Sequence, residues 1–117
     1  MEAKNHVTIY TWGSKVHKTC PIKTDKDFNV AGISSYKPHG VDLSVETGLN
    51  EKIQKHIMRQ KKFDLYSNTI LKTIRNGATT ISVYCHKGRH RSVATAEILA
   101  KELRNEGFVV TIYHCDI

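Results

Sequence analysis

Residues 85–92, CHKGRHRS, carry the clearest chemical signal in the chain. Five of the six positions from His86 to Arg91 are basic or can become so, and the sixth is glycine. The segment lies between a predicted strand and a predicted helix, and the amides that open a helix have no intrahelical acceptor. Such amides, surrounded by cationic side chains, are typical of a phosphate site. The predicted phosphate-binding residues here are Cys85, His86, Lys87, Gly88, Arg89, His90, Arg91 and Ser92.

The same segment also has the spacing of a cysteine-dependent phosphatase loop. In that alternative, Cys85 is the nucleophile that attacks a phosphorus atom, and Arg91 clamps the phosphate. A leaving-group acid is also required, and the candidates are Asp116, which follows the last predicted strand, and Asp42 in a long loop. The simpler alternative for the cysteine is a small buried residue at a strand end. The residues of the phosphatase pattern are Cys85, Gly88, Arg91 and Ser92.

Hydrophobic periodicity predicts the elements that position this segment. The 79–85 and 108–114 stretches are typical of strands, and the 91–107 stretch between them is typical of an amphipathic helix. Such a unit makes its two strands parallel, so residues that follow Cys85 and Tyr113 emerge at one sheet edge, where ligands usually bind. The fold class predicted is a single α/β domain, with helices packed on a mixed, partly parallel sheet and a C-terminal β-α-β unit. The other predicted elements are strands at 6–12 and 28–33 and helices at 50–60 and 62–76, with Asn50 as a cap and Gly77 and Gly107 as stops.

Length and charge indicate one small globular domain with an anionic partner. The chain has 117 residues, of which 39% are hydrophobic and 25% are charged. The 18 Lys and Arg residues exceed the 11 Asp and Glu residues, which gives a net charge of +7. This excess favours nucleic acid, a phosphorylated metabolite or an anionic surface as the partner.

Neither a membrane span nor a secretory signal is predicted, because no sufficiently long apolar run occurs. The three cysteines, Cys20, Cys85 and Cys115, do not form a disulfide framework, so a reducing compartment and a cytoplasmic location are predicted. Cys85, His86 and His90 have no second cluster of ligands at metal-site spacing. No metal and no cofactor are therefore predicted.

From residue 85 to its end, the chain resembles the C-terminal domain of the RapZ family. Members read Cys, two residues, Gly, one residue, His, Arg, Ser, Val before a helix, and they end in a strand followed by a His-containing turn. Upstream, TGLNEKI (47–53) is similar to the family's Thr-Gly-Leu-Asp element, and HVTIYTWGSK (6–15) resembles its first strand. The resemblance covers essentially all of 1–117 as one domain. The positions that match the family's motifs are Gly88, His90, Arg91, Ser92, Thr47, Gly48 and His114.

The resemblance implies a self-associating adapter domain for RNA processing that binds RNA and a phosphosugar. RNA is the favoured ligand, a phosphosugar or nucleotide is the alternative occupant, and no membrane partner is expected. Binding is preferred to catalysis because the family pattern accounts for His90 and for residues 47–50, whereas the phosphatase pattern accounts for neither. The chain has Ala31 and Cys115 at two positions where the family commonly has Arg. It also lacks a Gly-x-x-x-x-Gly-Lys-Ser loop, which predicts a module without the preceding nucleotide-hydrolysing domain.

Aromatic and basic residues elsewhere offer further contacts for RNA. Trp12, Tyr36 and Tyr66 are candidates for stacking on bases, although Tyr66 shares the apolar face of its predicted helix and is better explained as core. A basic patch on the predicted helices is usually a solvated face, but together with the 86–91 loop it would extend an RNA track. That patch consists of His56, Arg59, Lys61 and Lys62.

Overall fold

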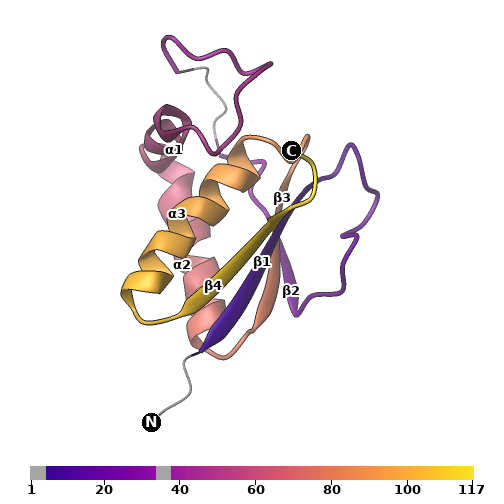
Figure 1. Ribbon diagram of the computed structural model, residues 1–117, viewed down its shortest axis with the longest axis vertical. Helices are drawn as coiled ribbons and strands as arrows, with labels where there is room; N and C mark the ends of the chain where they lie inside the picture. The colour runs from indigo at the N-terminus through magenta and orange to yellow at the C-terminus, as the bar shows by residue number, and fades with distance from the viewer. Residues whose placement is uncertain (1–4, 34–37) are drawn as a thin grey trace.

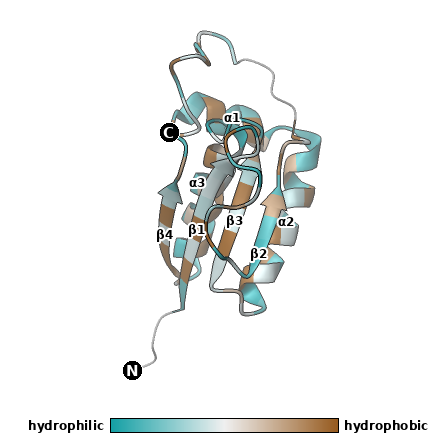
Figure 2. Cartoon of the chain, turned by 90° about the vertical axis from the view of Figure 1, so that its right-hand side faces the viewer, coloured by the Kyte–Doolittle hydropathy of each residue, from teal (hydrophilic) through white to brown (hydrophobic). Residues whose placement is uncertain are grey.

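In the computed structural model, which describes residues 5–33 and 38–117, three helices lie against one face of a four-stranded sheet (Figures 1 and 2). Tyr36, one of the stacking candidates, lies outside the described residues. The strand order across the sheet is β2-β3-β1-β4. The strands are β1 (His6–Gly13), β2 (Lys26–Asn29), β3 (Thr80–Cys85) and β4 (Val109–His114). The helices are α1 (Glu51–Met58), α2 (Lys61–Arg75) and α3 (Arg91–Asn105).

Every strand pairing in the described part of the chain is parallel. The predicted α/β domain with its C-terminal strand-helix-strand unit is confirmed as β3-α3-β4. The predicted mixture of strand directions is not found within 5–33 and 38–117, because β1 and β2 also run in the direction of β3. The carboxyl ends of the central strands therefore meet at one edge, where Gly13 pairs with Cys85 and Thr11 pairs with His114.

The hydrophobic core fills the space between the sheet and the helices. Ile9 and Ile81 from the strands are completely buried, as are Ile70 from α2 and Ala94 from α3. The opposite face of the sheet carries no helix in the described chain, and the segment at 14–25 crosses part of it (Figure 2). None of the described helices is long and apolar enough to cross a membrane.

The strand predicted at 28–33 is displaced toward the N-terminus, to Lys26–Asn29. Val30 still donates its amide to the Tyr84 carbonyl (2.8 Å), but the chain then turns, and Ile33 N donates to the Val30 carbonyl (3.1 Å). Both apolar side chains are buried in the core. Their hydrophobicity therefore reflects a buried turn, which a period-2 pattern cannot distinguish from a longer strand.

Local signals explain where the helices begin and end. The Asn50 side chain accepts a hydrogen bond from the Lys52 amide (2.8 Å) at the start of α1, as predicted. Gly77 and Gly107 follow α2 and α3 with φ of +115° and +94°, a conformation that glycine adopts without steric cost. The helix that follows the 85–92 loop thus ends at a glycine stop, as predicted.

Candidate anion-binding site

The 85–92 loop connects β3 to α3 at the carboxyl edge of the sheet, as predicted. Its first residues are tied to the segment after β1. Ser14 N donates to the Cys85 carbonyl (2.9 Å), and Lys15 N donates to the His86 carbonyl (2.8 Å). The parallel pairing therefore continues beyond both strands and fixes the start of the loop.

Two glycines allow the loop and the end of β1 to approach each other at backbone distance. A β-carbon at Gly13 would overlap the carbonyl group of Lys87, and one at Gly88 would lie 2.5 Å from Gly13 N. Gly88 also has φ of +72°, which disfavours any residue with a β-carbon. Gly13, which the sequence alone did not mark, is therefore a structural part of the loop.

The Thr47-Gly48 element supports the loop from another side. Gly48 N donates to the Arg89 carbonyl (2.8 Å), and a β-carbon at Gly48 would overlap the Ala94 amide in the first turn of α3. Thr47 Oγ1 accepts a hydrogen bond from Leu49 N (3.2 Å) within the same turn. The structure thus brings this predicted element to the loop, where it acts as a support.

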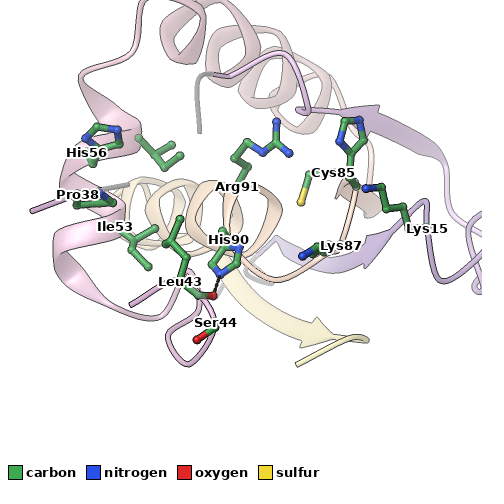
Figure 3. Close-up of a pocket in the computed structure, with 12 residues that line it drawn as sticks. Lys15, Pro38, Leu43, Ser44, Ile53, His56, Cys85, Lys87, His90 and Arg91 are labelled. Atoms are coloured by element: carbon green, nitrogen blue, oxygen red, sulfur yellow. Dashed lines mark hydrogen bonds between the residues drawn. The ribbon is translucent and has the colours of Figure 1, made fainter. Parts of the chain in front are cut away.

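His90 anchors the turn at 43–46 to the loop. Its Nε2 lies 2.8 Å from the Leu43 carbonyl oxygen (Figure 3) and 2.9 Å from the Glu46 carbonyl oxygen, so this nitrogen carries a proton and donates to them. The imidazole therefore holds the 43–46 turn beside the start of α3.

The backbone amides from 87 to 93 donate to no acceptor within the described part of the chain. Those of Arg91, Ser92 and Val93 open α3, where the positive end of the helix dipole favours an anion. Backbone donors rarely remain unpaired in folded proteins. These amides are therefore available to an oxyanion.

A cavity of about 380 Å³ opens beside the loop. Figure 3 shows Pro38, Leu43 and Ile53 on one side of it and Lys15, Cys85 and Lys87 on the other, with Arg91 between them. Small-ligand sites typically have volumes of about 300–1,000 Å³. No carboxylate of the described chain lines this cavity. Its basic lining residues are Lys15, His56, His86, Lys87, His90 and Arg91.

The Arg91 guanidinium is held at the cavity by the turn after β2. Its Nη1 donates to the Ala31 carbonyl and also lies 3.4 Å from the Ile33 carbonyl oxygen. Nε and Nη2 have no acceptor among the described residues. Because a guanidinium presents its donors as a planar fork, these free groups suit a phosphate oxygen pair.

Cys85 lies at the end of β3, 2% exposed, and its thiol donates to the Ser92 hydroxyl (3.3 Å). Both side chains are buried where the loop meets α3. In residues 5–33 and 38–117, no group of three or more His, Cys, Asp or Glu residues, around Cys85 or elsewhere, is arranged to hold a metal ion.

The two candidate acids do not line the cavity. Asp116 accepts hydrogen bonds from Gly13 N (2.8 Å) and from His17 Nε2 (3.0 Å), so both of its oxygens are engaged. Asp42 Oδ1 accepts from the Ser44 amide (3.0 Å) and hydroxyl (2.6 Å). Asp116 thus reaches the loop indirectly, by fixing the end of β1.

His114 also lies outside the cavity lining, beneath α3. Its Nε2 donates to Glu97 (2.9 Å), and Thr11 Oγ1 lies 2.7 Å from its Nδ1. The next residue, Cys115, replaces an arginine of the family pattern. Its thiol is exposed, and partial desolvation and the nearby Asp116 raise its pKa.

Two basic cavity residues, Lys15 and His56, were not predicted as members of this site. Lys15 follows β1 at the carboxyl edge of the sheet, and the sheet order would have indicated it. His56 was predicted as part of a helix-surface patch, but it lines the cavity, whereas Arg59, Lys61 and Lys62 do not.

The two predicted stacking residues that the structure describes are not free. Trp12 is only 4% exposed and its Nε1 donates to Ser82 (2.9 Å). Tyr66 is half-buried, with its hydroxyl close to Gly32.

Comparison with known proteins gives a consistent relationship. The family model described as the RapZ C-terminal domain matches residues 5–117. A nucleotide-binding protein from Caldicellulosiruptor bescii is similar, with 34% identity over 126 aligned positions that cover 95% of this chain and 40% of that protein. A nucleotide-binding protein from Streptomyces avermitilis is 39% identical over 128 positions, which cover 99% of this chain and 41% of that protein. The chain therefore spans about two fifths of the length of these relatives.

Proposed function

The chain belongs to the RapZ C-terminal domain family, and we propose that it is a binding domain that holds the phosphate group of a small molecule, a phosphosugar or a nucleotide, at the 85–92 loop. One observation carries this proposal. Amides at 87–93 and donors of Arg91 that find no acceptor among the described residues occur beside a cavity of about 380 Å³, which Lys87, His90 and Arg91 line. The apolar side of that cavity, with Leu43 and Ile53, offers space for the remainder of such a ligand.

Binding is favoured over hydrolysis by the surroundings of Cys85. Its thiol is buried and directed to Ser92. Neither Asp42 nor Asp116 lines the cavity, so neither carboxylate is placed to protonate a leaving group there. The amides and Arg91 hold a phosphate without any bond to sulfur.

Cys85→Ser is expected to leave the affinity for inorganic phosphate nearly unchanged, because the sulfur is not among the donors. The wild-type domain is expected to release no phosphate from an aryl phosphate such as p-nitrophenyl phosphate. Titration with phosphate, followed through the amide NMR signals of residues 87–93, measures the first result, and a colorimetric assay measures the second. Cys20→Ser, at a second free cysteine, is the matched control.

Wild-type turnover that disappears in Cys85→Ser would instead make Cys85 a nucleophile and establish the phosphatase alternative. Amide signals at 87–93 that ignore phosphate would remove the anion site altogether.

RNA is the second candidate ligand, favoured by the net charge of +7 and by basic side chains beside the cavity. Lys87 is exposed and Arg89 is half-buried on the loop. Each such side chain that contacts an RNA phosphate releases a condensed counterion. An RNA backbone phosphate would use the same amides as a small phosphorylated ligand, so the two ligand classes would compete.

The double variant with Lys87→Ala and Arg89→Ala is expected to bind RNA more weakly and with a flatter salt dependence. Each lost phosphate contact lowers the slope of log affinity against log salt by about 0.7–0.9. Fluorescence anisotropy with a labelled RNA at several salt concentrations measures this slope. A second double variant, Lys72→Ala with Lys101→Ala, removes the same charge from exposed positions on α2 and α3 and should retain the slope. Equal slopes for both double variants would exclude Lys87 and Arg89 from the interface.

The proposal extends to the role that the family relationship suggests, a cytoplasmic, self-associating adapter in RNA processing. The relatives named nucleotide-binding proteins are more than twice as long as this chain. A nucleotide is therefore proposed here only as one occupant of the cavity, and a nucleoside monophosphate is the appropriate probe to compare with a sugar phosphate in the phosphate titration.

A further inference from the structure

The face of the sheet opposite the helices carries a cluster of aromatic side chains. Tyr10 and Trp12 of β1 alternate with buried residues that face the helices, so their rings lie on the opposite face, together with Tyr84 of β3 and Tyr113 of β4. The 14–25 segment crosses this face in front of β3 and leaves β4 open (Figure 2).

The rings form two stacked pairs across neighbouring strands. Tyr10 and Tyr113 are register partners, with ring centroids 5.2 Å apart and an interplanar angle of 18°. Trp12 stacks on Tyr84 at 4.3 Å and 25°. Trp12 is buried, but Tyr113 is 53% exposed. Both stacked pairs are thus preformed, and the accessible ring of the Tyr10–Tyr113 pair is Tyr113.

Tyr113 lies at the edge of the sheet. β4 has only β1 as a neighbour in the described chain, and Tyr10 of that strand covers one face of the Tyr113 ring. Because Tyr10 lies on the neighbouring strand, the other ring face is turned away from β1, on the side where the described chain has no further strand. A flat aromatic group that stacked there would extend an existing pair and would require little rearrangement of the protein.

The net charge of the chain favours a polyanionic partner for this surface. The segment after β1 carries three exposed lysines, Lys15, Lys18 and Lys23, of which Lys15 also lines the cavity beside the phosphate loop. Three carboxylates also lie beside this segment: Asp25 accepts from the Thr79 amide (2.9 Å), Asp27 accepts from the hydroxyls of Thr24 and Ser82, and Asp116 accepts from His17 Nε2 (3.0 Å). The net charge of +7 on the whole chain attracts a nucleic acid to such a surface.

An arginine also lies at the free edge of β4. Arg104 Nη2 donates to the Val110 carbonyl (2.9 Å), which places its guanidinium beside the strand that carries Tyr113. The side chain is exposed, and its remaining donors have no acceptor among the described residues, so they are available to a phosphate. An aromatic ring and a cation at one strand edge match the alternating base and phosphate of a single strand.

We propose that Tyr113 is a stacking site for an unpaired base of single-stranded RNA, with the sheet face and the β4 edge as a surface separate from the phosphate loop. The proposal rests on the RNA-binding function proposed above. It replaces Trp12 and Tyr66, which are not free, with a ring that is accessible.

The test measures binding of a short oligoadenylate and of a blunt RNA duplex of equal length to the wild-type chain and three variants. Tyr113→Ala is expected to weaken oligoadenylate binding by about tenfold, since one stacked base contributes on that order. Its salt slope should stay unchanged because no charge is lost. Tyr113→Phe should bind like the wild type, and so should Thr111→Ala, an exposed position on the same face of β4. Duplex binding should be similar in all four proteins because its bases are not free to stack.

Tyr113→Ala with wild-type affinity for oligoadenylate would overturn the proposal, and so would an equal loss in Tyr113→Phe. If the Lys87/Arg89 double variant still shows a reduced salt slope in that case, RNA binding at the loop stands and only the sheet-face site fails. If Tyr113→Ala binds more weakly while that double variant is unaffected, the sheet-face site stands and the role of the loop in RNA binding fails. If oligoadenylate binds neither the wild type nor any variant, both the sheet-face site and RNA binding at the loop are overturned.

Discussion

Gly13→Ala is expected to abolish phosphate binding, although residue 13 carries no functional side chain. The added methyl group would overlap the Lys87 carbonyl, a backbone group that cannot move without displacing the 85–92 loop. Overpacking of this kind lowers the free energy of unfolding by about 1–3 kcal/mol. Displacement of Lys87 and Gly88 would also redirect the amides that hold the anion. Thermal unfolding measures the stability, and phosphate titration of the 87–93 amide signals measures the binding.

Gly107→Ala separates the loss of the site from a general loss of stability. Gly107 has φ of +94° and no atom within 4 Å of a β-carbon position, so alanine there meets conformational strain but no neighbour. That strain costs about 1–2 kcal/mol. The residue lies between α3 and β4, away from the loop. This variant should therefore unfold at a lower temperature and still bind phosphate. Equal phosphate affinity in Gly13→Ala and wild type would show that the contact between β1 and the loop does not shape the site.

Arg91→Ala is expected to weaken phosphate binding by about tenfold to a hundredfold. A hydrogen bond to a charged group contributes about 1.5–3 kcal/mol, and Nε and Nη2 of Arg91, which have no acceptor among the described residues, are placed for such bonds. The substitution also leaves the Ala31 carbonyl without this donor, which loosens the turn at the cavity. Calorimetry with inorganic phosphate, and with a sugar phosphate, measures the affinity.

Two further variants distinguish the geometry of Arg91 from its charge. Arg91→Lys keeps the charge and loses the planar fork, so its affinity should lie between those of alanine and wild type. Arg75 lies on α2 and forms an exposed ion pair with Glu106, the residue after α3. Arg75→Ala removes the same charge there and should bind phosphate normally. Equal affinity in Arg91→Ala and Arg75→Ala would mean that only long-range charge attracts the anion and that Arg91 does not contact it.

The sequence by itself determined the local features of this protein. Apolar residues at helical spacing, Ile70 and Ile74 among them, together with a glycine after each longer helix, predicted α2 and α3 to within two residues of their observed bounds. The basic loop between β3 and α3 was equally apparent, because a helix start and a cluster of cations are both properties of neighbouring residues. The strand at β2 was predicted too far along the chain because Val30 and Ile33 are buried in a turn. Apolar residues that are buried in a turn cannot be distinguished by sequence from those of a short strand.

Only the tertiary structure decided which distant residues complete the site. Gly13 touches Lys87, His90 holds Leu43, and Arg91 holds Ala31, in each case across more than forty residues of sequence. Asp116 and His114, which sequence placed at the same sheet edge, are instead engaged by Gly13, His17, Thr11 and Glu97. The reason is physical: strand order and the packing of helices on the sheet set these distances, and neither is encoded in the spacing of residues along one element. The accessible ring of Tyr113 follows from the same cause, since its exposure depends on β4 being the edge strand.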